Sequence, residues 1–224
     1  MLLDKLRNTN IDFLNTLKGV VSLLKDAGQT DSVYDIEDGL RHTEATRHAV
    51  EFVKQKPGVA ALIQERYIAP SPNLELLLTY PPDSLGYAYA SYLTESGFDP
   101  NFYRPIEVKD DISYVLLRLR QTHDIWHIVT GFSTDVAGEL GLKAFELAQT
   151  RRTIALVLVS GGLLSSLFKA PDTLDTLLDR VAVGYRMGAK ARPLLAQKWE
   201  EHWDLSVTDW RAQLEIEPTP IYIP

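Results

Sequence analysis

The feature that most constrains the fold is a helix–break–helix pattern between Tyr114 and Gln149. Residues that suit a helix run up to Thr130, and Gly131 then supplies the residue type that most readily takes the left-handed conformation after a helix ends. A Ser-Thr-Asp sequence follows at 133–135, and all three types cap helix N-termini. The pattern therefore predicts two consecutive helices that fold back on each other as a hairpin.

Four side chains that can bind a metal lie in this hairpin: His123, Asp124, His127 and Glu139. The two histidines are four residues apart, so a helix presents them on one face, about one turn apart. Asp124 precedes His127 by three residues and lies close to the same face. On one unbroken helix Glu139 would lie about 18 Å beyond His127. Because the break at Gly131 lets the second helix return, we expect all four side chains to converge.

Two imidazoles and two carboxylates form a set of nitrogen and oxygen donors, and the chain has no cysteine to add sulfur. Such a set suits Zn²⁺, Fe²⁺, Mn²⁺ or Co²⁺, and the residues alone do not choose among them. An open coordination position on the metal can lower the pKa of a bound water or bind O₂. The alternative without a metal is that both histidines are partly buried helix residues whose partners are local carboxylates.

Asp124, Arg118 and Arg120 are the candidates for catalysis. Asp124 is a metal ligand, a carboxylate that orients a histidine ring, or a general base. The HExxH pattern of zinc proteases is absent, which argues against a protease. Arg120 falls near the face of the histidines, where a guanidinium can bind a substrate carboxylate or phosphate through two hydrogen bonds. The alternative for both arginines is a salt bridge to Asp110, Glu139 or Glu146.

Helical periodicity recurs along the chain, and we see neither strict two-residue alternation nor a hairpin dipeptide such as Asn-Gly. The fold class is therefore predicted as all-α, a single-domain, bundle-like fold over residues 1–224. Helices are expected over residues 2–26, 41–55, 59–67, 73–78, 85–95, 110–130, 135–152, 154–168, 173–192 and 208–214.

The run 154–168 is nearly apolar but has only 15 residues, whereas a helix needs about 20 to cross a bilayer. We expect a buried helix, and contact of an amphipathic surface with a membrane stays open. Gly161 and Gly162 within the run each cost about 1 kcal/mol relative to alanine. They indicate a close helix crossing, with the wall of a channel for a lipid tail as the alternative.

The net charge and the N-terminal sequence bear on what the protein binds and where it is located. The net charge of −7 argues against a nucleic-acid-binding protein, which would show a basic face. The first residues lack the layout of a signal peptide and the Arg- and Ser-rich composition of a transit peptide. We therefore expect a cytoplasmic location, in a bacterial or an already processed chain.

The pattern His-Asp-x-x-His, eleven residues and then Glu resembles the signature of the ubiquinone (coenzyme Q) biosynthesis protein four family. In this chain the pattern consists of His123, Asp124, His127 and Glu139. The resemblance covers about residues 70–217. Similar flanking motifs are Asp83-Ser84-Leu85-Gly86, Phe98-Asp99-Pro100, Arg118-x-Arg120-Gln121, Gly131-Phe132, Glu139-Leu140 with Lys143, and the stretch from Pro193-Leu194 through Trp199-Glu200 to Trp210-Arg211.

The resemblance implies a protein of ubiquinone biosynthesis that binds polyprenylated ring intermediates and a divalent metal. Zinc is the metal that the family favours, and Fe, Mn, Co or Mg are alternatives. The first hypothesis is an enzyme that removes, oxidatively, the carboxyl group at ring carbon one of a prenylated 4-hydroxybenzoate-type intermediate, with Arg118 or Arg120 assisting. The second is a non-catalytic module that binds an isoprenoid lipid and organises other quinone-biosynthesis proteins around a structural metal, and a hydrolase comes third. Peripheral membrane contact and a homodimer are further expectations.

Overall fold

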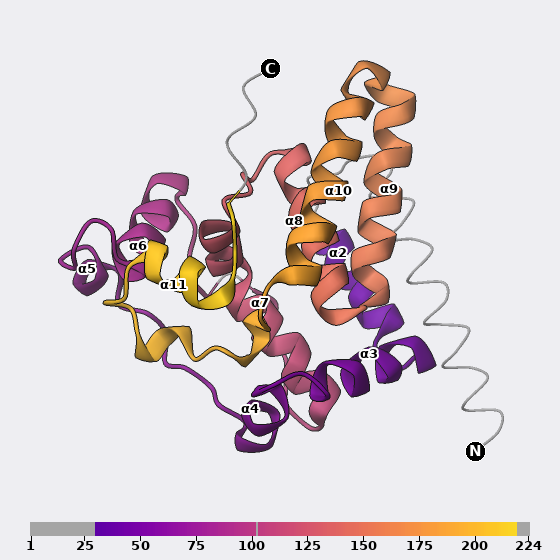
Figure 1. The fold of residues 1–224 in the computed structure, drawn as a ribbon. Coiled ribbons are helices and arrows are strands. Elements are labelled where there is room, and N and C mark those ends of the chain that lie inside the picture. Colours follow the sequence, from indigo (N-terminus) through magenta and orange to yellow (C-terminus); the bar gives the residue numbers. More distant parts are fainter. Residues whose placement is uncertain (1–29, 102, 219–224) are drawn as a thin grey trace. The chain divides into compact units, whose positions relative to one another are not determined.

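The computed structural model describes residues 30–101 and 103–218, and within these ranges every regular element is a helix (Figure 1). The prediction of an all-α fold is confirmed for the described residues, and the helix expected over residues 2–26 lies outside them. The elements are α2 (Thr30–Leu40), α3 (Glu44–Lys54), α4 (Val59–Glu65), α5 (Leu74–Leu77), α6 (Leu85–Ser96), α7 (Asp111–Thr130), α8 (Val136–Thr150), α9 (Thr153–Lys169), α10 (Leu174–Lys190) and α11 (Val207–Leu214), with short 3₁₀ turns η1 (Pro171–Thr173), η2 (Leu194–Ala196) and η3 (Trp199–Glu201).

The helices fall into two compact units, and each unit combines segments that are distant in the sequence. Unit 1 takes in the described residues up to Phe52 together with Thr134–Gly188, and so contains α2, α8, α9 and α10. Unit 2 consists of Val53–Ser133 and the described residues from Ala189 onward, and contains α4 to α7 and α11. The single domain expected over residues 1–224 stays a prediction.

In unit 1 the helices α8, α9 and α10 lie side by side (Figure 1) because glycines let their backbones approach. A Cβ atom added to Gly162 of α9 would lie 2.5 Å from Leu140 of α8. A Cβ atom on Gly184 of α10 would lie only 2.0 Å from the carbonyl oxygen of Gly141. The predicted close crossing of the glycine-bearing helix is therefore present.

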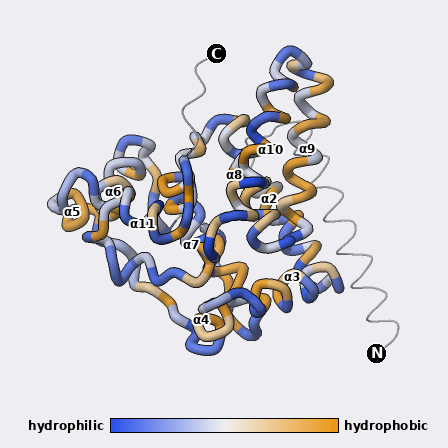
Figure 2. The backbone as a smooth tube through the Cα atoms, in the orientation of Figure 1, coloured by the Kyte–Doolittle hydropathy of each residue, from blue (hydrophilic) through white to orange (hydrophobic). Residues whose placement is uncertain are grey.

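The α9 helix is only partly buried, which corrects the expectation for residues 154–168. Its inner face packs Ile154 and Leu158 against Ile36 of α2. Apolar residues also occur on the face that α2 and α8 do not cover (Figure 2), because their spacing of three or four residues places them on one side of the helix. The exposed apolar residues of α9 are Leu156, Leu164, Leu167 and Phe168.

None of the helices in the described part of the chain has the length and hydropathy that a bilayer-crossing segment needs. The most apolar of them, α9, has 17 residues, against the roughly 20 that span the hydrocarbon core.

Unit 2 is arranged around α7, which packs against α4, α6, α11 and η2. Nearby residues set both ends of the long α7 helix. Asp110 accepts a hydrogen bond from the Ser113 N–H in a capping box, and Gly131 ends the helix with a φ of 79°. Asp135 then caps α8 by accepting from the Gly138 N–H. The predicted helix–break–helix pattern is thus observed with its predicted caps.

One predicted boundary differs from that observed, and one predicted separation between helices has a visible cause. The helix expected over residues 41–55 begins at Glu44, because the Thr43 hydroxyl accepts a hydrogen bond from the Thr46 N–H and so caps α3. The apolar run after α8 is a separate helix, because Arg151 takes a left-handed conformation with a φ of 55° and interrupts the backbone.

Candidate metal centre

The last two turns of α7 place His123 and His127 on the same face, as their spacing predicts. Their Nε2 atoms face each other at 3.3 Å, and the ring centroids are 4.8 Å apart in an edge-to-face arrangement. The His127 side chain is buried, so its orientation is fixed by packing as well as by hydrogen bonding.

The chain direction after α7 fixes the tautomer of His127. Its Nδ1 lies 3.0 Å from the carbonyl oxygen of Phe132, one residue beyond the Gly131 turn. Because a carbonyl oxygen can only accept, the proton of the neutral ring is on Nδ1 and the Nε2 lone pair points toward His123. This backbone contact is the kind that orients metal-binding histidines.

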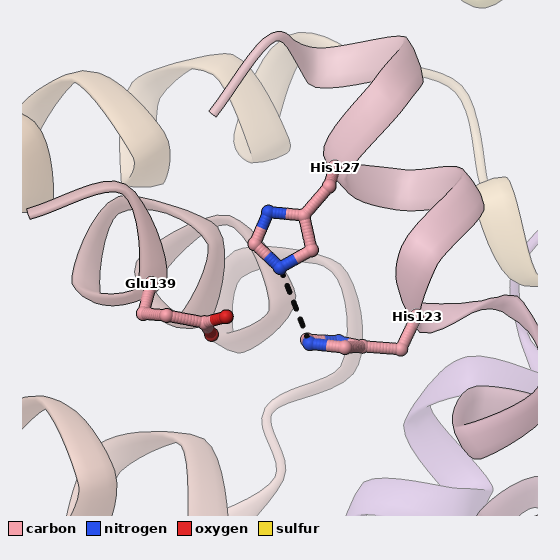
Figure 3. A group of neighbouring side chains, drawn as sticks. All are labelled: His123, His127 and Glu139. Atoms are coloured by element: carbon pink, nitrogen blue, oxygen red, sulfur yellow. Dashed lines mark hydrogen bonds between the residues drawn. The ribbon is translucent and has the colours of Figure 1, made fainter. Parts of the chain in front are cut away.

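Glu139 lies in the first turns of α8, where the short turn between α7 and α8 returns the chain toward His127. Its carboxylate joins the two imidazoles in a group whose ligand atoms all lie within 4.8 Å of one another. Figure 3 shows the carboxylate pointing toward the facing Nε2 atoms. Three of the four ligands predicted from the sequence are therefore brought together.

The donor set and its spacing fit a divalent metal. Two nitrogens bound at about 2.0–2.1 Å to one tetrahedral ion lie about 3.3 Å apart, and the observed separation of the Nε2 atoms is 3.3 Å. Without an ion, the His123 Nε2–H can donate to the Nε2 lone pair of His127; with an ion, both Nε2 lone pairs can point at the metal. The His123, His127 and Glu139 side chains would hold the metal.

Asp124 lies outside this group, in contrast to the predicted four-ligand set. It follows His123 directly, so a helix turns its side chain about 100° away from that histidine. Its Oδ2 atom accepts a hydrogen bond of 2.8 Å from the Tyr103 hydroxyl. Burial, and then the negative charge of Asp124, raise the pKa of Tyr89, so the carboxylate lies within electrostatic range of two phenols.

The two arginines have different surroundings. The Arg118 side chain is buried and donates from Nη1 and Nη2 to the two carboxylate oxygens of Glu200, at 2.5 and 2.8 Å. Nη2 also donates to the carbonyl oxygen of Gln197 at 2.9 Å. Arg118 therefore forms a salt bridge, but with Glu200 and not with one of the three carboxylates named from the sequence. Arg120 is also buried, and its Nη1 donates to the carbonyl oxygen of Arg104 at 2.7 Å.

Sequence reasoning missed two contributors to this region. Tyr103 lies in the loop before α7, where no periodic pattern indicates which side chain turns toward Asp124. Lys143 lies partly exposed on α8, four residues after Glu139. The i, i+4 spacing of Glu139 and Lys143 was readable from the sequence and could have drawn attention to the lysine.

Residues 18–220 match the family model for coenzyme Q (ubiquinone) biosynthesis protein Coq4. Among curated proteins, the mitochondrial ubiquinone biosynthesis protein COQ4 homolog of Aedes aegypti is 28% identical over 202 residues, which cover 88% of this chain and 68% of that protein. The mitochondrial ubiquinone biosynthesis protein COQ4 of Uncinocarpus reesii is 31% identical over 152 residues, which cover 66% of this chain and 53% of that protein. The matched part is thus about half the length of the Uncinocarpus relative.

A solved structure has the same fold. The crystal structure of a Nostoc punctiforme protein proposed to act in ubiquinone biosynthesis is similar to this chain with a TM-score of 0.81 and 38% sequence identity. The similarity covers 89% of this chain and 96% of the Nostoc chain. The helical arrangement described above is therefore shared with a close structural neighbour.

Proposed function

We propose that this chain, which belongs to the coenzyme Q (ubiquinone) biosynthesis protein Coq4 family, is a metal-dependent enzyme of that pathway. The proposed reaction is oxidative removal of the carboxyl group at ring carbon one of a prenylated 4-hydroxybenzoate-type intermediate: the carboxyl group leaves as carbon dioxide, a hydroxyl group from water takes its place, and O₂ accepts the two electrons and two protons to become hydrogen peroxide. The observation that carries the proposal is the group formed by His123, His127 and Glu139. Three protein ligands are typical of catalytic metal sites, whereas structural zinc sites use four.

The proposed ligands hold a divalent metal, which when bound supplies Lewis acidity toward a carboxylate or a site for O₂. The separation of the histidine nitrogens fits a tetrahedral ion such as zinc, which would supply Lewis acidity, whereas a direct role of the metal with O₂ requires a redox-active ion such as Fe or Mn. His127 is kept in one tautomer by the Phe132 carbonyl, so its Nε2 lone pair stays directed into the group.

Asp124 is proposed as the proton-handling residue beside the ligands. The Tyr103 hydroxyl holds one carboxylate oxygen of Asp124, which fixes its orientation and leaves the other oxygen to accept a proton. Arg120 is retained as a candidate for binding the substrate. Arg118 is assigned a structural role instead, because both of its terminal nitrogens are bound to Glu200.

The second candidate function is a non-catalytic module that binds an isoprenoid lipid and organises other quinone-biosynthesis proteins. The exposed apolar residues of α9 favour this reading, because Phe168 is 82% exposed and Leu156 is 51% exposed. Exposed apolar surface of this kind marks contact with a lipid, a membrane or another protein. Peripheral membrane association and a homodimer belong to the same proposal.

The proposed metal centre is tested by elemental analysis of the protein purified without added metal. The wild type should carry about one equivalent of a transition metal, and His127→Ala and Glu139→Ala should lose it while remaining folded by circular dichroism. His48→Ala is the matched control, because His48 is exposed on α3. Retention of metal by both ligand variants would place the ion elsewhere.

The proposed reaction is tested with the metal-loaded wild type and a prenylated 4-hydroxybenzoate under O₂. Release of carbon dioxide with a hydroxyl group gained at ring carbon one is the expected result, and Asp124→Asn should slow it without loss of metal. Tight binding of the same compound with no turnover would favour the lipid-binding module.

A further inference from the structure

Four charged side chains of unit 1 form a buried chain of ion pairs: Glu37, Arg152, Glu146 and Lys143. Arg152 contacts Glu37 and donates from Nη1 to Glu146 Oε1 at 2.8 Å. Lys143 Nζ donates to the other oxygen of Glu146, Oε2, at 2.9 Å. Buried charges are tolerated when they are paired and hydrogen-bonded. Two cations and two anions balance here, so the chain of ion pairs has no net charge.

The Lys143 ammonium has N–H donors that the ion pairs do not use. A lysine ammonium carries three N–H groups, and within the described residues Lys143 donates one hydrogen bond, to Glu146. The Lys143 side chain is 18% exposed, so it is reachable although it is largely enclosed. A half-enclosed cation with spare donors is a site for an anion.

Helix geometry places this cation beside the metal group. Lys143 follows Glu139 by four residues on α8, so the two side chains lie on one face, about one turn apart. The Lys143 Nζ pairs with the Glu146 carboxylate at 2.9 Å, and this ion pair keeps the side chain as an ammonium.

We propose that Lys143 binds the carboxylate group of the substrate next to Glu139, which gives the metal centre a built subsite for a monoanion. The inference deepens the proposed function and rests on it. A divalent metal, two neutral imidazoles and the Glu139 carboxylate carry a net charge of +1, and one carboxylate neutralises it. Lys143 adds directed hydrogen bonds, while its own charge is already balanced by Glu146. A dianionic phosphate would leave an uncompensated negative charge in the enclosed site.

From the sequence, Arg118 or Arg120 was expected to bind the substrate carboxylate, and the contacts of Arg118 argue against that role for it. Both terminal nitrogens of Arg118 donate to Glu200, and Nη2 also donates to the Gln197 carbonyl, so the charge of this arginine is committed to a partner in the protein. A lysine ammonium is compact and its three donors can rotate. It can therefore bind a carboxylate in several orientations, whereas the rigid fork of a guanidinium favours one.

The proposal is tested by calorimetric titration of the zinc-loaded full chain with benzoate and with benzamide, its neutral isostere. The wild type should prefer benzoate, and Lys143→Met and Lys143→Gln should weaken benzoate binding roughly tenfold or more, the scale of one charge-assisted hydrogen bond. Benzamide affinity and zinc content should stay unchanged. Lys143→Arg, which keeps the cation, should recover part of the preference. Lys109→Met is the control, because Lys109 is exposed and paired with Glu107.

Each outcome decides the question. Equal benzoate affinity in the wild type and in both neutral variants, at equal zinc content, would overturn the proposal, and so would a wild type that does not distinguish benzoate from benzamide. A wild type that takes up no zinc would refute the proposed metal centre instead. In that case the titration is carried out with the metal-free protein. A preference for benzoate that is lost in the Lys143 variants would support the subsite, and no such preference would overturn the proposal.

Discussion

Replacing Arg118 by methionine tests whether this arginine serves the fold or the chemistry. Methionine keeps much of the apolar stem but removes the guanidinium, which makes two hydrogen bonds to Glu200 and one to the Gln197 carbonyl. Side-chain exposure is 1% for Arg118 and 9% for Glu200, so solvent does little to screen the pair. The variant therefore leaves a buried carboxylate without its partner.

The expected loss follows from that burial. Removing one partner of a buried ion pair costs about 3–5 kcal/mol, and the orphaned Gln197 carbonyl adds roughly 1 kcal/mol. We expect a loss of about 4–6 kcal/mol in the free energy of unfolding. For a chain of this size that corresponds to a melting temperature lower by roughly 8–24 °C.

The assay is urea unfolding followed by circular dichroism, with Glu200→Met and the double variant completing a cycle. An apolar pair often replaces a buried ion pair at little cost, so the double variant should be more stable than Arg118→Met alone. The reasoning fails if Arg118→Met unfolds within about 1 kcal/mol of the wild type. A stable variant that lost only benzoate binding would restore the substrate-binding role predicted from the sequence.

Three further predictions concern other parts of the structure. Gly184→Ala should destabilise the protein by about 3 kcal/mol in urea unfolding, because its Cβ would meet a backbone carbonyl at 2.0 Å. Gly162→Ala should cost less, since the atom that it meets belongs to the Leu140 side chain, which can rotate. Hydrogen bonds from Arg66 and Lys54 hold the pKa of Asp111 below its usual 3.8, so the stabilisation that they give is present above about pH 4 and is lost as the pH falls through the lowered pKa. Because Asp111 is 36% exposed, Asp111→Asn should lose less than about 1 kcal/mol of stability at pH 7. In urea unfolding, the stabilities of this variant and the wild type should converge near pH 2. Tyr103→Phe should keep the zinc content but slow carbon dioxide release and shift its pH profile, because Asp124 loses its hydrogen bond; an unchanged profile would separate Tyr103 from the chemistry.

Local signals in the sequence were sufficient for the helix–break–helix pattern. Asp110, Gly131 and Asp135 act through hydrogen bonds and backbone conformations that span only a few residues, so their positions could be predicted and were confirmed. The pairing of His123 with His127 has the same origin, because helix periodicity alone places them on one face.

Long-range partners could not be predicted in this way. Glu200 lies 82 residues from Arg118, and no local pattern selects it from the other carboxylates of the chain. Asp124 was expected among the ligands because it lies near the histidines in the sequence. The helix turns it toward Tyr103 instead, and a loop residue of this kind has no periodicity from which its direction follows.

The interleaving of the two units has a consequence for how the chain is made. Unit 2 begins at Val53 but is completed only by residues from Ala189 onward, with residues 134–188 belonging to unit 1 in between. During synthesis α7 therefore emerges from the ribosome long before Glu200 is available to its buried Arg118. Until that partner arrives, the nascent chain presents an unpaired cation and unburied apolar surface, so the newly made protein should depend on chaperone protection in proportion to the time spent translating that intervening segment.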